Sequence, residues 1–128
     1  MKEAEVREIV VRYFDAALNE LDVKVFVSLF TPDGVLEDPV GTPPHQGREA
    51  IHQFVSAART KIERGEVNIG EIFACGSESA VRWTVQLSTK RGEHLTINGC
   101  GIFMFNEERQ IRHVREYYDV ASLLAILA

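Results

Sequence analysis

Cysteines and long apolar runs are what this 128-residue chain has least of. Cys75 and Cys100 stand alone, without the CxxC spacing of a metal or redox site. They could pair if strands brought them together, but their isolation favours buried free thiols in a reducing compartment. No apolar stretch approaches the roughly 18 residues that a helix needs to cross a bilayer. We therefore expect a cytoplasmic protein without a membrane partner.

Basic character is also scarce, since the formal net charge is −5 and the longest basic run is Lys90-Arg91. A nucleic-acid-binding domain normally presents a basic face, so we expect no nucleic-acid partner. The histidines show neither i,i+4 pairing nor an HExxH motif, and no Gly-rich phosphate loop follows a strand. The sequence predicts no metal site and no cofactor.

The length fits a single domain comprising residues 1–128. About two-thirds of the unfolded surface can be buried at this size, which allows a core and one internal pocket. Apolar residues at spacings of three and four predict a helix over 4–21 and a third helix over 47–64. A shorter helix capped by Asp22 lies between them, followed by a turn over 31–34.

After Gly65 the apolar period changes from helical to two, which is typical of strands. The predicted strands cover 66–75, 80–89, 94–105 and 111–118. Gly99 and Gly101 inside the third of these strands predict a bend or bulge. Helices followed by a meander indicate an α+β fold, with three N-terminal helices on a strongly curved, mostly antiparallel sheet. A strongly bent sheet can wrap around the helices and leave a conical cavity, and its outer face would then be free to pack on a second subunit.

The segment between Val35 and Gly47 carries the strongest functional signal. A short strand ends at Asp38, and Pro39 restricts the Asp38 backbone to extended geometry. A carboxylate held in this way at the mouth of an apolar cavity is a candidate proton acceptor. Asp-Pro pairs also open ordinary turns, so a purely structural role for Asp38 is the alternative.

Several blocks of the sequence carry a family resemblance over nearly the whole chain. They are Tyr13-Phe14, Leu29-Phe30, residues 35–41 (VLEDPVG), Pro43-Pro44, residues 47–51, residues 103–106 and Tyr117-Tyr118. These blocks resemble Δ5-3-ketosteroid isomerase and the wider SnoaL-like branch of the nuclear-transport-factor-2-like superfold. The resemblance implies a conical α+β fold, a homodimer, a deep apolar pocket and Asp38 as the base that shuttles a proton.

The family also uses an oxyanion hole made by a tyrosine and a protonated aspartic acid. The resemblance places that tyrosine at Phe14 and that acid at Gly101, so both groups are missing from their usual positions. Tyr13 lies about 100° away around the helix and would need a one-residue register shift to replace the tyrosine. Because losing one oxyanion donor typically costs about a hundredfold or more in rate, catalysis itself stays an open question.

The last strand offers a replacement for the missing acid. If Tyr118 faces the pocket, Glu116 faces it too, because side chains on one face of a strand recur every second residue. A buried glutamic acid has a raised pKa and can stay protonated at neutral pH as an acid or hydrogen-bond donor. In the opposite register Glu116 would be a solvated charge, and both registers are open.

The candidate catalytic residues are thus Asp38, Tyr13 and Glu116. The candidate ligand-binding residues are all aromatic: Phe14, Phe30, Phe54, Trp83, Phe103 and Tyr118. The leading hypothesis is cofactor-free proton transfer by Asp38 on a hydrophobic, steroid-like or polyketide-like ketone. A second hypothesis is an epoxide hydrolase or polyketide cyclase that pairs Asp38 with Glu116 or Glu66. A third is a non-catalytic homodimer, joined through the outer sheet face, that only binds a hydrophobic ligand.

Overall fold

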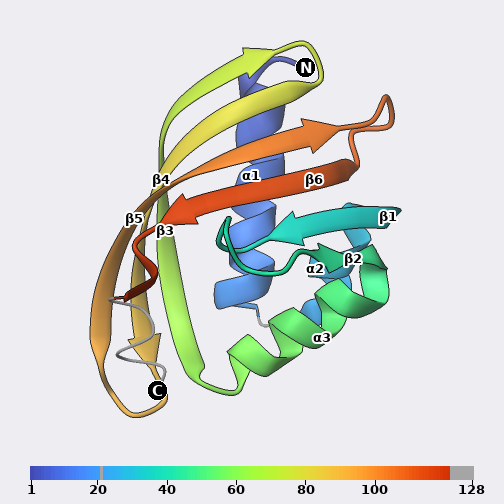
Figure 1. Ribbon diagram of the computed structural model, residues 1–128. Coiled ribbons are helices and arrows are strands. Elements are labelled where there is room, and N and C mark those ends of the chain that lie inside the picture. Colours follow the sequence, from blue (N-terminus) through green and yellow to red (C-terminus); the bar gives the residue numbers. More distant parts are fainter. Residues whose placement is uncertain (21, 122–128) are drawn as a thin grey trace.

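The computed structural model describes residues 1–20 and 22–121 and shows helices packed on a strongly curved sheet (Figure 1). Its elements are α1 (Glu3–Leu18), α2 (Val23–Ser28), β1 (Phe30–Glu37), β2 (His45–Gln46), α3 (Gly47–Arg59), β3 (Ile62–Cys75), β4 (Glu78–Thr89), β5 (His94–Phe105) and β6 (Ile111–Tyr118). The expected strands 94–105 and 111–118 are confirmed with their bounds. None of the helices within the described residues has the length and apolar character to cross a bilayer.

The strands form one sheet in the order β2-β1-β6-β5-β4-β3. Only the β1–β6 pair is parallel, and the other neighbouring pairs are antiparallel. The long strands β3, β4 and β5 curve around α1, while α3 lies below β1 and β2 (Figure 1). The α+β class and the curved, mostly antiparallel sheet are therefore confirmed.

Strict alternation along β4 builds the centre of the core. Val81, Trp83, Val85 and Leu87 are buried on one face, whereas the residues between them are half-buried or exposed. These side chains join Val10 of α1 in one apolar cluster. Because each fully buried aliphatic or aromatic side chain contributes about 1.5–3 kcal/mol, this face holds α1 against the sheet.

The two glycines of β5 make room for neighbouring side chains. Pairing with β4 runs through Gly99 and Gly101 without a register shift, so the structure shows no bulge there. A Cβ atom at Gly99 would lie 2.4 Å from Cζ2 of Trp83, and one at Gly101 would lie 2.2 Å from Oε1 of Glu116. Both glycines are thus required by close side-chain approach from the adjacent strands, because a methyl group at either position would collide with them.

Several predicted boundaries were wrong. The first helix ends at Leu18 instead of residue 21, and the strands predicted from residues 66 and 80 begin at Ile62 and Glu78. The third helix ends at Arg59 instead of residue 64, because Ile62 already pairs with Thr89 and buries its side chain from a strand. The apolar spacing from the helix into Ile62 fits both kinds of element, and sheet pairing decided between them. The expected turn over 31–34 lies within β1, where pairing with β6 is interrupted between Phe30 and Val35.

Both cysteines are free thiols, but Cys75 is exposed and Cys100 half-buried, so the expectation of buried thiols was wrong. Leu21 and most of the apolar tail expected after Asp119 lie outside the described residues.

We predict that Gly99→Ala lowers the free energy of unfolding by about 1–3 kcal/mol, the usual cost of overpacking a core. The added methyl group would collide with the Trp83 ring, which is itself 4% exposed and has little room to move. Urea unfolding followed by far-UV circular dichroism measures the change. Thr96→Ala on the exposed face of the same strand is the control. Equal stability of the two variants would contradict this prediction.

Candidate active site

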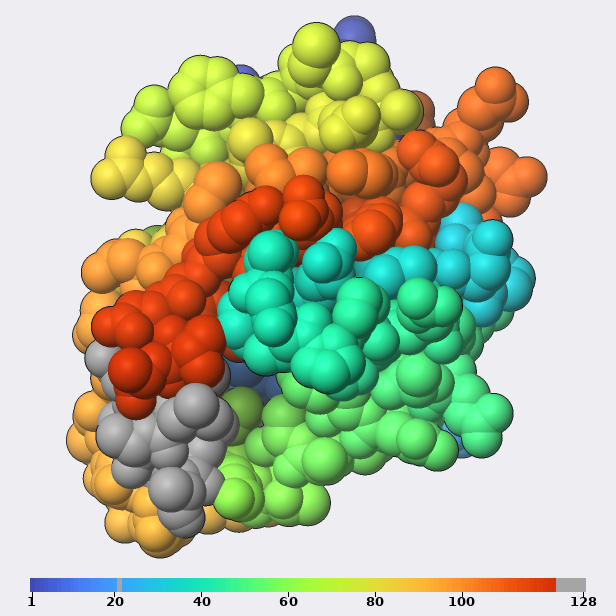
Figure 2. Space-filling model, in the orientation of Figure 1, coloured from blue at the N-terminus to red at the C-terminus, as the bar shows by residue number. Residues whose placement is uncertain are grey.

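A cavity of about 810 Å³ lies between α1, α3 and the concave face of the sheet. Its wall is mostly apolar and includes Phe14, Phe54, Val85 and Ile97. Figure 2 shows a hollow between the end of β6, the segment joining β1 to β2, and α3, with α1 visible at its floor. Within the described part of the chain, no three histidine, cysteine or acidic side chains converge as metal ligands would.

Contacts on both faces of β1 position Asp38 at the cavity. Leu36 is fully buried beneath the strand. Oε2 of Glu37 lies 2.6 Å from Nε2 of His113 and accepts a 3.0 Å hydrogen bond from Nε of Arg115. These contacts lower the pKa of Glu37, the His113 contact most of all. They fasten the end of β1 to β6, and Asp38 is the next residue.

The turn after Asp38 is also fastened to β6. The Asp38-Pro39 peptide is cis, and the backbone N–H of Val40 donates a 2.8 Å hydrogen bond to the carbonyl oxygen of Glu116. The hydroxyl of Tyr118 donates to Oδ1 of Asp38. Asp38 is therefore held by backbone and side-chain contacts beside the strand that carries Glu116.

Burial raises the pKa of Asp38, and the hydrogen bond from Tyr118 partly opposes this effect. Asp38 is half-buried and lines the cavity. A raised pKa makes the ionised carboxylate a stronger proton acceptor, which is what a general base requires. Asp38 therefore lies in the cavity wall with its pKa shifted in the direction that favours a general base.

Glu116 is a second carboxyl group in the same cavity and is only 2% exposed. Nε1 of Trp83 donates a 3.1 Å hydrogen bond to its Oε1, and the hydroxyl of Tyr13 donates a 3.3 Å hydrogen bond to its Oε2. Burial, and then the charge of Asp38, raise the pKa of Glu116 to about 8, although the two hydrogen bonds act in the opposite direction. Glu116 is therefore mainly a neutral carboxylic acid at pH 7.

The carboxyl group of Glu116 fills the space in front of Gly101, the position where the resemblance places the family's second acid. Gly101 and Glu116 are paired across β5 and β6, so their side-chain positions point to the same face. The hydroxyl of Tyr13 reaches this carboxyl group, whereas Phe14, at the position where the resemblance places the tyrosine, has no hydroxyl. An acid and a phenol thus reach the cavity from positions adjacent to those of the family pattern.

The structure places seven of the candidate site residues in the cavity wall. They are Tyr13, Phe14, Asp38, Phe54, Trp83, Glu116 and Tyr118. Phe30 and Phe103 are fully buried and lie outside that wall, so their expected role in ligand contact was wrong. Both pack against the ring of Tyr13, at centroid distances of 6.4 and 5.2 Å, because they fill the layer behind it.

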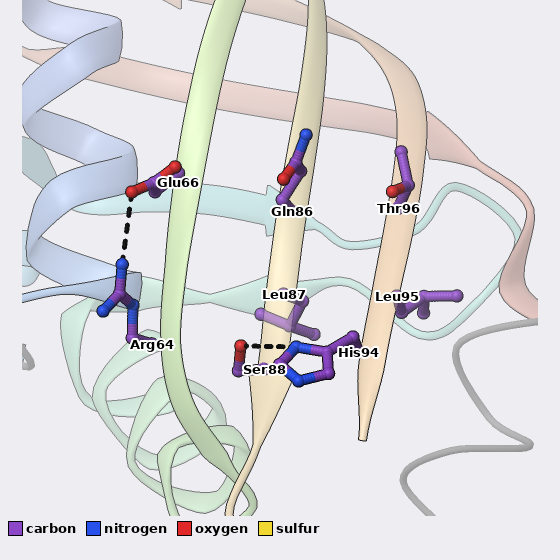
Figure 3. Close-up of a pocket in the computed structure, with 8 residues that line it drawn as sticks. All are labelled: Arg64, Glu66, Gln86, Leu87, Ser88, His94, Leu95 and Thr96. Carbon is purple, nitrogen blue, oxygen red and sulfur yellow. Dashed lines mark hydrogen bonds and ion pairs between the residues drawn. The ribbon is translucent and has the colours of Figure 1, made fainter. Parts of the chain in front are cut away.

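Glu66 does not share the cavity with Asp38. It is exposed on the outer face of the sheet, where it forms a 3.2 Å ion pair with Arg64. Figure 3 shows both residues with Ser88 and His94. These residues line a hollow of about 430 Å³ whose wall does not include Asp38. The hypothesis that pairs Asp38 with Glu66 is therefore wrong. Dimerisation through this outer face stays a prediction.

Sequence reasoning missed His45, whose ring stacks on Phe54 with 4.0 Å between centroids in the cavity wall. Partial burial lowers the pKa of His45 and so favours the neutral ring. Its position just after the Pro43-Pro44 pair was the available signal, because that loop enters the pocket region.

Helices packed on a strongly curved, mostly antiparallel sheet form a nuclear-transport-factor-2-like fold, and the comparisons narrow the class. Residues 10–114 match the SnoaL-like domain family, and the chain belongs to that family. It is 28% identical over 123 residues to a steroid Δ-isomerase of Nocardioides simplex, covering 94% of this chain and 95% of the relative. The family resemblance is thereby confirmed.

Solved structures support the same assignment. The epoxide hydrolase/cyclase-like enzyme SalBIII, which has a role in pyran ring formation in the polyether salinomycin, is 26% identical with a TM-score of 0.79, and 94% of this chain and 95% of that chain are covered. A nuclear-transport-factor-2-like protein from Burkholderia pseudomallei has a TM-score of 0.82 at 16% identity, with 100% and 99% covered. The latter similarity shows the fold alone.

We predict that the Glu116 carboxyl makes the protein less stable as the pH rises. Its pKa is raised from 4.5 to about 8 on folding, so the folded state binds the proton more tightly. The stabilisation is complete below the lower value and is lost as the pH rises through the higher one. The unfolding free energy of the wild type should fall relative to that of Glu116→Gln between about pH 5 and about pH 9.

Urea unfolding at both pH values measures this difference, and Asp38 is present in both proteins. Glu66→Gln, which alters an exposed carboxylate, should track the wild type across the range. A constant gap between the wild type and Glu116→Gln would contradict the raised pKa.

Proposed function

We propose that this protein catalyses cofactor-free proton transfer on a hydrophobic ketone. The observation that carries the proposal is one apolar cavity that contains two carboxyl groups with different partners and different proton affinities. Asp38 is hydrogen-bonded to Tyr118, whereas the more deeply buried Glu116 is hydrogen-bonded to Tyr13 and Trp83. Pairs of titratable groups with separated pKa values provide the acid and the base of a reaction.

In the proposed reaction the ketone oxygen lies near Tyr13 and Glu116, and the neighbouring C–H bond faces Asp38. The Asp38 carboxylate removes the proton, the C–H electron pair forms the C=C bond of the enolate, and the carbonyl electrons move to oxygen. Asp38 then returns the proton to another carbon of the conjugated system. The double bond shifts, and no cofactor or net proton is consumed.

The hydroxyl of Tyr13 is the proposed donor to the enolate oxygen. When Glu116 is protonated, its own O–H can donate to the phenol oxygen of Tyr13, since the two oxygens lie 3.3 Å apart. The Tyr13 proton is then available to the ligand. A preorganised donor of this kind acts in a site that excludes water, where hydrogen bonds to developing charge are strongest.

The relationship to a steroid Δ-isomerase supports a steroid-like ketone as the substrate. The mostly apolar cavity of about 810 Å³ suits a hydrophobic skeleton of that size class.

A second candidate function is epoxide opening, supported by the similarity to the epoxide hydrolase/cyclase-like SalBIII. Glu116 would donate its proton to the epoxide oxygen as the C–O bond breaks. Asp38 would accept the proton of an attacking water or hydroxyl group, whose oxygen forms the new C–O bond. This reaction uses the same two groups, but it requires proton transfer from Glu116 and not only a hydrogen bond.

We predict that Asp38→Asn lowers isomerase activity on a 5-ene-3-ketosteroid by at least about a hundredfold, because the amide cannot accept the proton. Absorbance of the conjugated product measures the rate. Glu66→Gln changes a carboxylate outside the cavity and should leave the rate unchanged. Retention of activity in Asp38→Asn would remove Asp38 as the base.

Glu116→Gln separates the two reactions. Glutamine can donate a hydrogen bond but cannot supply a proton, so isomerisation should fall by about tenfold and epoxide opening by about a hundredfold or more. Parallel assays with a 5-ene-3-ketosteroid and a hydrophobic epoxide measure both rates. If the wild type turns over neither substrate yet binds the enolate mimic equilenin, the non-catalytic binding function replaces both.

A further inference from the structure

Tyr118 contacts the proposed base directly. Its hydroxyl donates a hydrogen bond to Oδ1 of Asp38, and its side chain lines the same cavity. Within residues 1–20 and 22–121, Oδ2 of Asp38 has no hydrogen-bond partner, and this atom is not enclosed by the protein. The two oxygens of the carboxylate are therefore unequal, because one is occupied by a phenol and the other is accessible.

The ring of Tyr118 is held in place from the neighbouring strands. Its centroid lies 5.9 Å from that of Trp83, whose indole also donates to Glu116. Tyr118 pairs with Gly99 across β6 and β5, and the Trp83 ring occupies the space that a side chain at residue 99 would need. A packed ring therefore presents the hydroxyl to Asp38.

We propose that Tyr118 is a positioning residue for the base: it holds Oδ1 of Asp38 and leaves Oδ2 as the oxygen that takes the proton. The role of Asp38 in this inference rests on the proposed function. The terminal torsion of an aspartate is broad, so a carboxylate held by its backbone alone can rotate its two oxygens. A hydrogen bond from a fixed ring removes that freedom, and a misplacement of about 1 Å can cost about a hundredfold in rate.

The hydroxyl of Tyr118 keeps its own proton through the proposed reaction. Before proton transfer it donates to the Asp38 carboxylate, and this bond opposes the effect of burial on the pKa of Asp38. Oδ2 then takes the proton from carbon, and the electron pair of the C–H bond passes to the enolate. Burial, and then the charge of Asp38, raise the pKa of Tyr118 above its ordinary value, so the phenol stays a donor.

Other titratable groups share this part of the cavity. Burial, and then nearby carboxylate charge, raise the pKa of Tyr13 on α1 and of Glu116 on β6. The wall also contains His45, Arg59 and Lys61. Among the described residues, Tyr118 is the side chain that donates a hydrogen bond to Asp38. Removal of this one hydroxyl therefore alters the base without removing a charge from the cavity.

The test compares Tyr118→Phe with Tyr117→Phe. Both variants lose one phenol hydroxyl from β6, but Tyr117 is 43% exposed and lies on the opposite face of the strand. With a 5-ene-3-ketosteroid, Tyr118→Phe should lower kcat by about tenfold or more with little change in KM, because the ring stays in the wall while the base loses its orientation. Tyr117→Phe should keep the kcat and KM of the wild type.

The pH profile distinguishes this role from general structural damage. Removing a hydrogen bond that lowers the pKa of Asp38 should move the acidic limb of the kcat/KM profile to higher pH in Tyr118→Phe and leave it in place in Tyr117→Phe. Thermal unfolding checks that both variants are folded. If Tyr118→Phe is not, 3-fluorotyrosine in place of Tyr118 keeps the ring and supplies a more acidic donor, which should move the limb to lower pH.

Titration of the Asp38 carboxyl carbon by NMR measures the contact without turnover, and it should occur at higher pH in Tyr118→Phe than in the wild type. That shift, combined with no turnover of any ketone or epoxide by the wild type, refutes the proposed function and leaves the Tyr118 contact intact. Turnover by the wild type with an unchanged kcat in Tyr118→Phe, or an equal loss in Tyr117→Phe, overturns the inference. An unchanged Asp38 titration in Tyr118→Phe overturns it as well.

Discussion

The carboxyl group of Glu116 is a polar group that is almost fully buried, and the residues around it supply its hydrogen-bond partners and its space. Burying a carboxylate without partners is costly, and burial raises the pKa of Glu116 to about 8. One of its oxygens accepts a hydrogen bond from Trp83, and the other lies at hydrogen-bond distance from the hydroxyl of Tyr13. Gly101 leaves the space that the group fills. The turn after Asp38 is hydrogen-bonded to the backbone carbonyl of Glu116 through Val40. Glu116 therefore supplies one carboxyl group of the cavity and helps to hold the other, that of Asp38.

Alternation along single strands was enough to predict the long strands and the inward face of β4. Asp38 was the clearest candidate for a functional residue, because a strand end followed by proline is a local signal. The aromatic residues were less predictable. Phe14 and Phe30 look alike in the sequence, yet one lines the cavity and the other is fully buried behind Tyr13, because helix rotation and layer packing decide between them.

The relation between Gly101 and Glu116 shows why the rest of the site could not be predicted residue by residue. The two positions are 15 residues apart in the chain and become neighbours only through the pairing of β5 with β6. A comparison along the sequence finds a glycine where the resemblance expects an acid and infers a loss. In three dimensions the carboxyl group of Glu116 reaches the same space from the neighbouring strand. A Cβ atom at position 101 would lie 2.2 Å from Oε1 of Glu116, so a side chain there is incompatible with Glu116 in its present position.

Because Glu116 lies on β6 and not on β5, its carboxyl group has hydrogen-bond partners of its own. One oxygen of Glu116 is hydrogen-bonded to Trp83 and the other to Tyr13. In the two proposed reactions, the proton of Glu116 would serve a ligand either directly or through the phenol. The first route suits a group that must be protonated, such as an epoxide oxygen, and the second suits a hydrogen bond to an enolate.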